Sequence, residues 1–298
     1  GTNGVIIITT KTSQKEMPPT IDYSGYISVS NTLRKPDFMS ASDLRQKWSE
    51  GYEFTGANNE DFGYDTDWLD EITRTAVSHV HNLSLRGGSK QTNYTASLNY
   101  RNRQGTFINT DFESLTGRFD INHSMFDNKI TANVSAVLSE HTMPRSWNNY
   151  AYRQALIHNP TEPVKNEDGS WYERTLYFYD NPVSYVKETI GEMKRKNTRF
   201  TGSLTYRPVE GLTLKAMYAR RSTTTDGYYQ TKKHVSNTKN GKNGYAYRKD
   251  SDFSNNLAEL TANYQKSFGK HNLNALVGYN YEDNTNSNMA IDNYDFPS

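Results

Sequence analysis

The chain contains no cysteine and no long apolar run, and each absence excludes a class of protein. Without cysteine there is no disulfide scaffold, no thiol nucleophile and no thiolate metal site. The longest uninterrupted apolar runs, Val5 to Ile8 and Leu176 to Tyr179, are far shorter than the roughly 18 residues that a membrane-spanning helix needs. A helical membrane protein is therefore excluded. A membrane β-barrel is compatible with such a sequence, because only every second residue of its strands faces lipid.

Hydrophobic side chains are scarce, but aromatic side chains are not. Hydrophobic residues make up 34% of the 298 residues and the mean hydropathy is −0.90, whereas 13% of the residues are aromatic, including 22 tyrosines. Disordered chains are poor in aromatic residues, so the composition favours a folded chain. The net charge of +1 gives no sign of a nucleic-acid partner, and we expect none.

Motifs of common enzyme classes are also missing. The sequence has no Gly-x-Ser-x-Gly elbow, no phosphate-binding glycine loop and no His-Glu-x-x-His pair. A glycosidase would need two carboxylates facing one cleft, and the spacing places no such pair. We therefore predict a protein that is not an enzyme, with no catalytic residue, no metal site and no cofactor.

The strongest positive signal is an alternation of apolar and polar residues, which predicts β-strands. Ile130, Ala132 and Val134, for example, alternate with Thr131 and Asn133. Nine segments show the pattern: about 20–31, 77–87, 92–101, 112–126, 129–139, 199–207, 211–221, 252–268 and 271–281. Several are longer than the five or six residues typical of a soluble sandwich.

The two predicted strand faces differ in chemistry. One face is aliphatic in the middle of the strands with tyrosine or phenylalanine near their ends, as in a lipid-facing band with aromatic girdles. The other face is polar and carries Arg118, Asp120, Arg199 and Lys215, which we predict to face a wet lumen. The fold class predicted is all-β, a partial antiparallel transmembrane barrel.

Connections between the predicted strands alternate between short and mostly long ones. Short turns are expected at 87–91, 126–129, 207–211 and 268–271, and long segments at 32–76, 142–196 and 226–250. Short helices are expected in the long segments at 40–48, 65–74 and 147–160, and a turn around Asp168-Gly169 within 166–173. Outer-membrane barrels show this alternation, with short turns on one side and long loops on the other.

Nine strands are an odd number for a closed meander and would leave two open edges. We therefore expect them to be part of a larger barrel. The opening GTNGVIIITT, an apolar strand without a polar face, is expected to end a preceding domain.

The opening run resembles the last plug strand of SusC/RagA-like TonB-dependent outer-membrane transporters of Bacteroidetes. HNLSLRGGSKQTNYTASLNYRNRQG, residues 81–105, is similar to the second and third barrel strands of the same group. The resemblance implies that residues 1–15 are the C-terminal plug strand and residues 16–298 the N-terminal portion of a barrel of about 22 strands around a plug.

The resemblance also implies a function. Such proteins lie in the outer membrane of Gram-negative bacteria and import oligosaccharides or peptides. Their partners are TonB, reached through parts absent from this sequence, and a SusD-like lipoprotein that covers the outer mouth. Outer-membrane lipid would surround the chain. The alternative left open by the residues is a secreted or surface-exposed β-rich ligand-binding module without transport activity.

Aromatic and amide side chains crowd the long segment after the fifth strand. They are candidates for contact with a ligand or with the lid protein: Trp147, Asn148, Asn149, Tyr150, Trp171, Tyr177 and Tyr179. The alternative is that they form a small core among the loops.

Three further groups have a functional and a structural interpretation. His79 and His81 share a strand face and are either a metal pair or interfacial histidines. The acidic group Asp65, Asp67, Asp70 and Glu71 either binds Ca²⁺ or marks a helix N-terminus. A basic loop either meets phosphates or an acidic substrate, or is simply solvated: Lys232, Lys233, Lys239, Lys242, Arg248 and Lys249.

Overall fold

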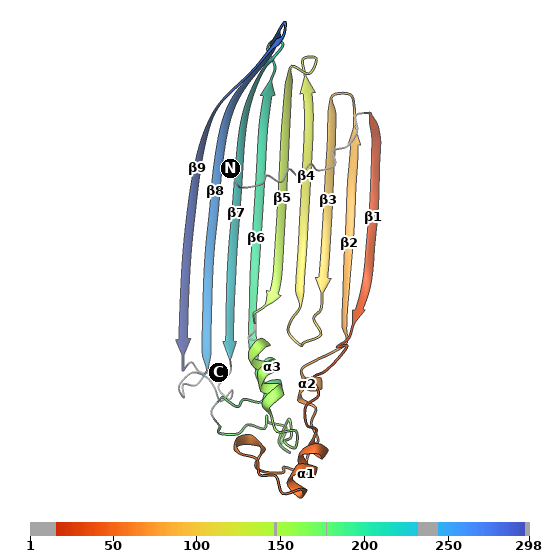
Figure 1. Ribbon diagram of the computed structural model, residues 1–298, viewed down its shortest axis with the longest axis vertical. Helices are drawn as coiled ribbons and strands as arrows, with labels where there is room; N and C mark the ends of the chain where they lie inside the picture. Colours follow the sequence, from red (N-terminus) through yellow and green to blue (C-terminus); the bar gives the residue numbers. More distant parts are fainter. Residues whose placement is uncertain (1–15, 146–147, 177, 232–243, 296–298) are drawn as a thin grey trace.

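The computed structural model describes residues 16–145, 148–176, 178–231 and 244–295, and its main element is one antiparallel sheet (Figure 1). The nine strands lie in sequence order, each paired with the next. They are β1 (Met17–Ser30), β2 (Ala76–Gly88), β3 (Thr92–Arg103), β4 (Phe112–Met125), β5 (Ile130–Pro144), β6 (Thr189–Tyr206), β7 (Leu212–Thr231), β8 (Tyr245–Phe268) and β9 (His271–Tyr294). All nine predicted strands are confirmed. The predicted plug strand within 1–15 lies outside the described residues, and the domain boundary after residue 15 stays a prediction.

Four strands extend well beyond their predicted ends. β6 begins at Thr189 rather than at 199, β7 continues to Thr231, β8 begins at Tyr245 and β9 continues to Tyr294. The added segments carry mostly polar side chains with a few apolar ones, such as Ile190 and Met289, so no sustained hydrophobic alternation marks them. The predicted loops at 142–196 and 226–250 are accordingly too long. Continuous pairing from Thr189↔Thr231 to Tyr206↔Leu214 shows that the backbone ladder persists where the side-chain pattern stops.

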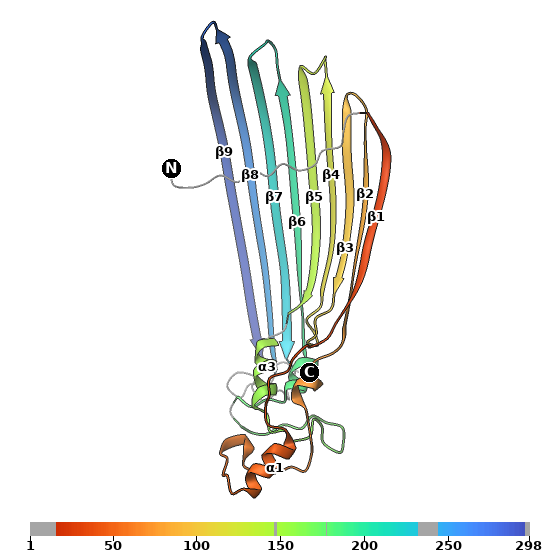
Figure 2. The ribbon, with the colours of Figure 1, turned by 45° about the vertical axis from the view of Figure 1, so that its right-hand side comes forward.

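Short turns occupy one end of the sheet and the long segments with all described helices occupy the other (Figures 1 and 2). The short turns follow β2, β4, β6 and β8. In the third of them, Gly211 has a φ of +84°, and a Cβ there would lie 2.2 Å from the carbonyl oxygen of Gln265. The predicted alternation of connections is therefore confirmed.

The helices are short. α1 (Ala41–Ser49) starts with a capping box, in which Ser40 Oγ accepts from the Asp43 amide at 3.2 Å while the Asp43 carboxylate accepts from the Ser40 amide at 2.9 Å. A 3₁₀ turn, η1 (Gly56–Asn58), follows. α2 (Trp68–Glu71) and α3 (Asn148–Ile157) are shorter than predicted. α4 (Pro182–Glu188) was not predicted, although Asn181 caps it and Pro182 occupies its first turn. Within the described parts of the chain, no helix has the length and apolarity needed to cross a bilayer.

The hydrophobic core lies among the connections rather than on the sheet. We call it the loop-end cluster. Its buried members come from α2 and its flank, from α3 and from α4: Trp68, Leu69, Ile72, Ala151, Ala155, Val183, Tyr185 and Val186. Segments separated by more than a hundred residues thus form one packed unit at the loop end of the sheet. This is the small loop core that the sequence offered as one alternative.

The sheet faces show how the strands are inclined. One row of paired residues begins with apolar side chains and ends with polar and charged ones: Ile21, Leu85, Ala96, Phe119, Ala136, Phe200, Arg220, Asn256 and Asp283. The apolar band therefore crosses the rows obliquely. It runs from Ile21–Val29 on β1 to Leu273–Tyr281 on β9, a shift of about ten residues over the sheet. Strands lie about 4.8 Å apart and rise about 3.4 Å per residue. This shift therefore means that the strands are inclined about 40° to the direction perpendicular to the band. Membrane barrels have the same tilt.

We expect Trp68→Ala to destabilise the loop-end cluster by about 3–5 kcal/mol, because a large buried side chain leaves a cavity. Trp68 is 3% exposed, and its Nε1 donates to the Asn159 carbonyl at 2.9 Å. Hydrogen exchange in α3 and α4 of the full-length protein measures the effect. The matched control is Tyr52→Ala, since Tyr52 is 57% exposed. Equal protection in both variants would contradict the assignment of this core.

Candidate functional site

The candidate functional side chains lie at two places, the loop-end cluster and the polar face of the sheet. Of the predicted ligand- or lid-contacting residues, Trp147 and Tyr177 lie outside the described residues, and Asn148 is described only by its backbone at the start of α3. The remaining four are Asn149, Tyr150, Trp171 and Tyr179, and all lie in or beside the loop-end cluster.

These four residues differ in their access to solvent. Tyr179 is 5% exposed and stacks on His158 with ring centroids 4.0 Å apart, so its side chain belongs to the core. Tyr150 is half-buried and donates its hydroxyl to the Asp180 carboxylate. Trp171 lies at the margin, where its Nε1 donates to Glu188 at 3.0 Å. Asn149 is exposed and lines a cavity, described below.

A buried polar network holds the loop-end cluster together. The fully buried Glu162 accepts from Arg174 Nη1 at 2.8 Å and from the Tyr179 hydroxyl at 3.0 Å. Burial raises the pKa of Glu162, and the hydrogen bonds from Arg174 and Tyr179 oppose that rise. His158 lies 3.7 Å from Glu162, but burial lowers its pKa to about 3, so it is neutral at pH 7 and contributes no ion pair. Arg174 is therefore the cationic partner of Glu162.

Two buried asparagines connect separate loop segments. Asn159 donates its side-chain amide to the carbonyls of Ala57 and Glu60, at 3.0 and 2.9 Å. Asn181 donates to Val164 and Tyr172 and also accepts from the first amides of α4. Because each amide hydrogen-bonds backbone carbonyls of separate loop segments, these side chains help to fix the fold of the connections.

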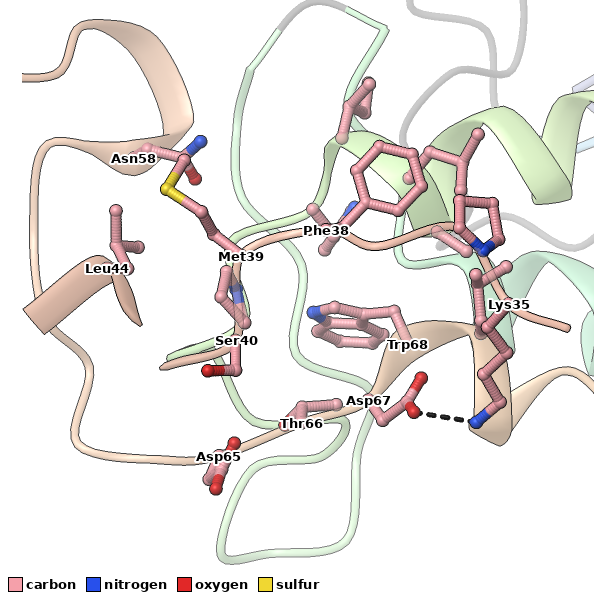
Figure 3. Close-up of a pocket in the computed structure, with 17 residues that line it drawn as sticks. Lys35, Phe38, Met39, Ser40, Leu44, Asn58, Asp65, Thr66, Asp67 and Trp68 are labelled. Atoms are coloured by element: carbon pink, nitrogen blue, oxygen red, sulfur yellow. Dashed lines mark hydrogen bonds and ion pairs between the residues drawn. The ribbon is translucent and has the colours of Figure 1, made fainter. Parts of the chain in front are cut away.

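A pocket of about 260 Å³ lies under the extended segment 31–39, which we call the strap (Figure 3). Trp68 forms one wall, and Phe38 and Met39 of the strap line the same pocket. Lys35 holds the strap down, with its Nζ 2.7 Å from Asp67 and 2.9 Å from Asp70. The hydrogen bonds that Lys35 donates to these carboxylates raise its pKa, so Lys35 stays charged at neutral pH.

A second cavity of about 320 Å³ lies on the other side of Lys35 and Pro36. Tyr152, Phe107 and Asn149 line it. Aromatic walls beside hydroxyl and amide groups, with carboxylates in the first pocket only, suit a sugar ring or a peptide side chain. No nucleophile–base pair is evident in either lining. Lys35, Phe38 and Trp68 were not predicted as site residues, because no local sequence pattern shows that segments 35–39 and 155–160 meet.

The four predicted lumen residues lie on one face of the sheet. Arg118 and Arg199 occupy the same row, separated by Val137 on β5. Asp120 is paired with Arg118, whose Nε and Nη2 donate at 2.5 and 3.2 Å. Lys215 lies on the same face nearer the short turns, between Thr205 and Thr261.

The other candidate groups have structural partners. His79 Nδ1 and His81 Nε2 lie 3.2 Å apart on the apolar face, where His81 also contacts the Tyr23 hydroxyl at 2.7 Å. Asp67 accepts from the Asp70 amide as the N-cap of α2 and pairs with Lys35. Within the described parts of the chain, no group of three His, Asp or Glu side chains is arranged to hold a metal ion. In the basic loop, residues 232–243 lie outside the described residues, and Arg248 pairs with Asp250 at 3.1 Å.

No protein-family model matches the chain. Among curated proteins, TonB-dependent receptor P3 of Formosa agariphila is 30% identical over 95% of this chain and 28% of its own length. TonB-dependent receptor SusC of Bacteroides thetaiotaomicron is 33% identical over 60% of this chain and 18% of its own length. The chain thus spans less than a third of these relatives.

Two solved structures share the fold. The RagAB peptide importer in its "open-open" state matches with a TM-score of 0.76, 17% identity, and coverage of 97% of this chain and 37% of that one. The structure of the RagAB peptide transporter matches with a TM-score of 0.75 at 18% identity and the same coverage. At such identities the match shows a common architecture, a partial antiparallel barrel with its loops at one end.

Glu173 is expected to make the loop-end cluster sensitive to pH. Burial raises its pKa to about 7, with Asp180 and Glu162 adding to the effect, while it accepts from the Asn181 amide and Ser184 hydroxyl. The folded form therefore keeps a proton that the unfolded form has lost, so stability is highest below about pH 4.5 and falls by up to about 1.4 kcal/mol per pH unit until about pH 7. Thermal unfolding of the cluster, followed by tryptophan fluorescence of the full-length protein, measures this slope.

Glu173→Gln should flatten the slope between pH 4.5 and 7. The control is Glu167→Gln, an exposed acid in the same segment. A slope in Glu173→Gln as steep as that of the unchanged protein would show that another group carries the pH dependence.

Proposed function

Because the chain is a relative of the SusC-like TonB-dependent receptors, we propose that it forms part of an outer-membrane transporter that imports a nutrient. The chain supplies strands of the barrel wall and the loop-end cluster at one of its mouths. Energy would come through TonB, by way of parts of the transporter outside this chain. The imported substrate is an oligosaccharide or a peptide.

The single observation that supports this proposal best is the oblique apolar band on one sheet face. The side chains of Leu204, Leu260 and Val277 on this face are 47%, 58% and 73% exposed. Exposing such an apolar sheet face to water is unfavourable. Lipid would cover them, with tyrosines such as Tyr206 and Tyr279 at or near the band edges. A soluble ligand-binding module would instead need a second layer on this face.

We propose that the loop end faces outward and receives a lipoprotein lid of the SusD kind. The strap presents Leu33, Phe38 and Met39 with exposed fractions of 101%, 51% and 46%, and Tyr52 and Tyr64 lie exposed nearby in sequence. Such a group of exposed apolar side chains is typical of a protein contact. Asn149, which lines the second cavity, and Trp171, at the margin of the loop-end cluster, would face the substrate.

Deletion of the full-length gene tests the function. We expect loss of growth on one glycan or peptide source from a panel, with normal growth on free monosaccharides and amino acids as the control. The full-length protein should fractionate with the outer membrane. Unimpaired growth on every source, or a protein found soluble in the periplasm, would contradict the proposal.

The face assignment can be tested by two adjacent substitutions on β8. Leu260→Arg should cost about 2–4 kcal/mol, because it places a charge in the apolar band, and should lower the amount of folded protein in the outer membrane. Thr261→Arg faces the polar side and should cost little. Heat-modifiable migration in gels quantifies the folded fraction. If both variants assemble equally, the band does not face lipid.

A further inference from the structure

Two arginines face each other directly on the polar face of the sheet. Arg199 on β6 pairs with Arg221 on β7, and both side chains are exposed. Like charges at directly opposed positions destabilise a sheet unless an anion lies between them. This pair is therefore a feature that the fold by itself does not explain.

Neither arginine has a carboxylate partner among the described residues. The guanidinium of Arg199 has no hydrogen-bond, ion-pair or ring partner there, and Arg221 lies over the Phe253 ring at 5.9 Å. The surrounding positions on the same face are all neutral: Val137, Asn197, Thr201, Ala219, Thr223 and Asn255. By contrast, Arg86 and Arg118 on this face are each paired with an aspartate.

Charge of one sign continues from this pair toward the loop end. Cations on the polar face there are Arg101, Arg195 and Lys249, and the rows between Arg199 and Lys249 carry no carboxylate on that face. The opposite face at the same level mixes both signs in pairs, such as Lys196 with Glu140 and Arg248 with Asp250. At this level the polar face thus carries cations without carboxylates, whereas the opposite face carries both signs.

The position of the arginine pair along the strands indicates from which end of the sheet an anion would reach it. On β6 the apolar band ends at Phe200, the neighbour of Arg199 on the opposite face. On β7 the band ends at Tyr218, three residues before Arg221. The arginines thus lie at the loop-side edge of the band, open to the compartment that the loops face.

We propose that Arg199 and Arg221 form an anion-binding subsite for an acidic oligosaccharide, whose carboxylate or sulfate group lies between the two guanidinium groups. This inference rests on the proposed function and specifies its substrate class. Guanidinium forks match the geometry of such groups. The amides and hydroxyls of Asn197, Thr223 and Asn255 suit sugar hydroxyls.

The test uses the full-length transporter purified in detergent. Calorimetry measures binding of hexasaccharides derived from pectate, alginate, chondroitin sulfate and heparin, with maltohexaose as the neutral probe and hexaglutamate as the acidic peptide. We expect at least one acidic hexasaccharide to bind more tightly than both maltohexaose and hexaglutamate. The double variant Arg199→Gln/Arg221→Gln should weaken that binding about 100-fold, about tenfold for each charge-assisted contact.

Two variants separate a binding role from a structural one. Arg220→Gln removes the adjacent arginine on the opposite face and should leave affinity within about twofold. Arg199→Lys/Arg221→Lys keeps the charge and should restore part of the affinity, and added salt should weaken binding to the unchanged protein. Unchanged affinity in the Gln double variant, equal binding of maltohexaose or hexaglutamate, or no binding of any acidic hexasaccharide would overturn the assignment. Uptake of a neutral glycan or a peptide by cells would leave the proposed function intact, so the two failures are distinguishable.

Discussion

The structure depends on a sheet whose two faces meet different surroundings. In the proposed membrane setting, every second side chain must be apolar over the band, and the backbone must pair strand to strand because lipid offers no hydrogen bonds. Unbroken register from β2 to β9 meets the backbone requirement. A slip of one residue would exchange the faces and put Arg118 or Arg199 into the band, so the register is strongly specified.

The loop-end cluster meets a different requirement. Its connections leave the sheet, so their backbone N–H and C=O groups need hydrogen-bond partners other than a neighbouring strand. The side-chain amides of Asn159 and Asn181 donate to backbone carbonyls, and the Glu162–Arg174 ion pair lies inside the cluster. The exposed strap and the two cavities adjoin this unit. The same region therefore has a packed core and a surface open to solvent. The polar face of the sheet, with Arg199 opposite Arg221, extends from this unit toward the short turns.

Strand number, order and faces could all be predicted from the sequence, because alternation is a local signal. The ends of β6 to β9 could not, because neighbouring residues such as Lys194 and Arg195 on β6 are polar on both faces, and only backbone pairing continues the sheet there. Alternation placed Arg118 and Arg199 on one sheet face, where they lie, and their contact with a lumen stays a prediction. Tyr179, a candidate for contact with a ligand or lid, is 5% exposed. Lys35 and Trp68 gave no signal, because their partners are distant in sequence.

The central claim is that even and odd residues of β8 face different media. Single cysteines placed from residue 254 to 264 of the full-length transporter report this directly, since this chain contributes no cysteine of its own. In isolated outer membranes, a charged maleimide should label cysteines at odd positions from 257 to 263 and spare those at 258, 260 and 262, which lie in the band. Labelling without a two-residue period, or with the opposite phase, would contradict the account.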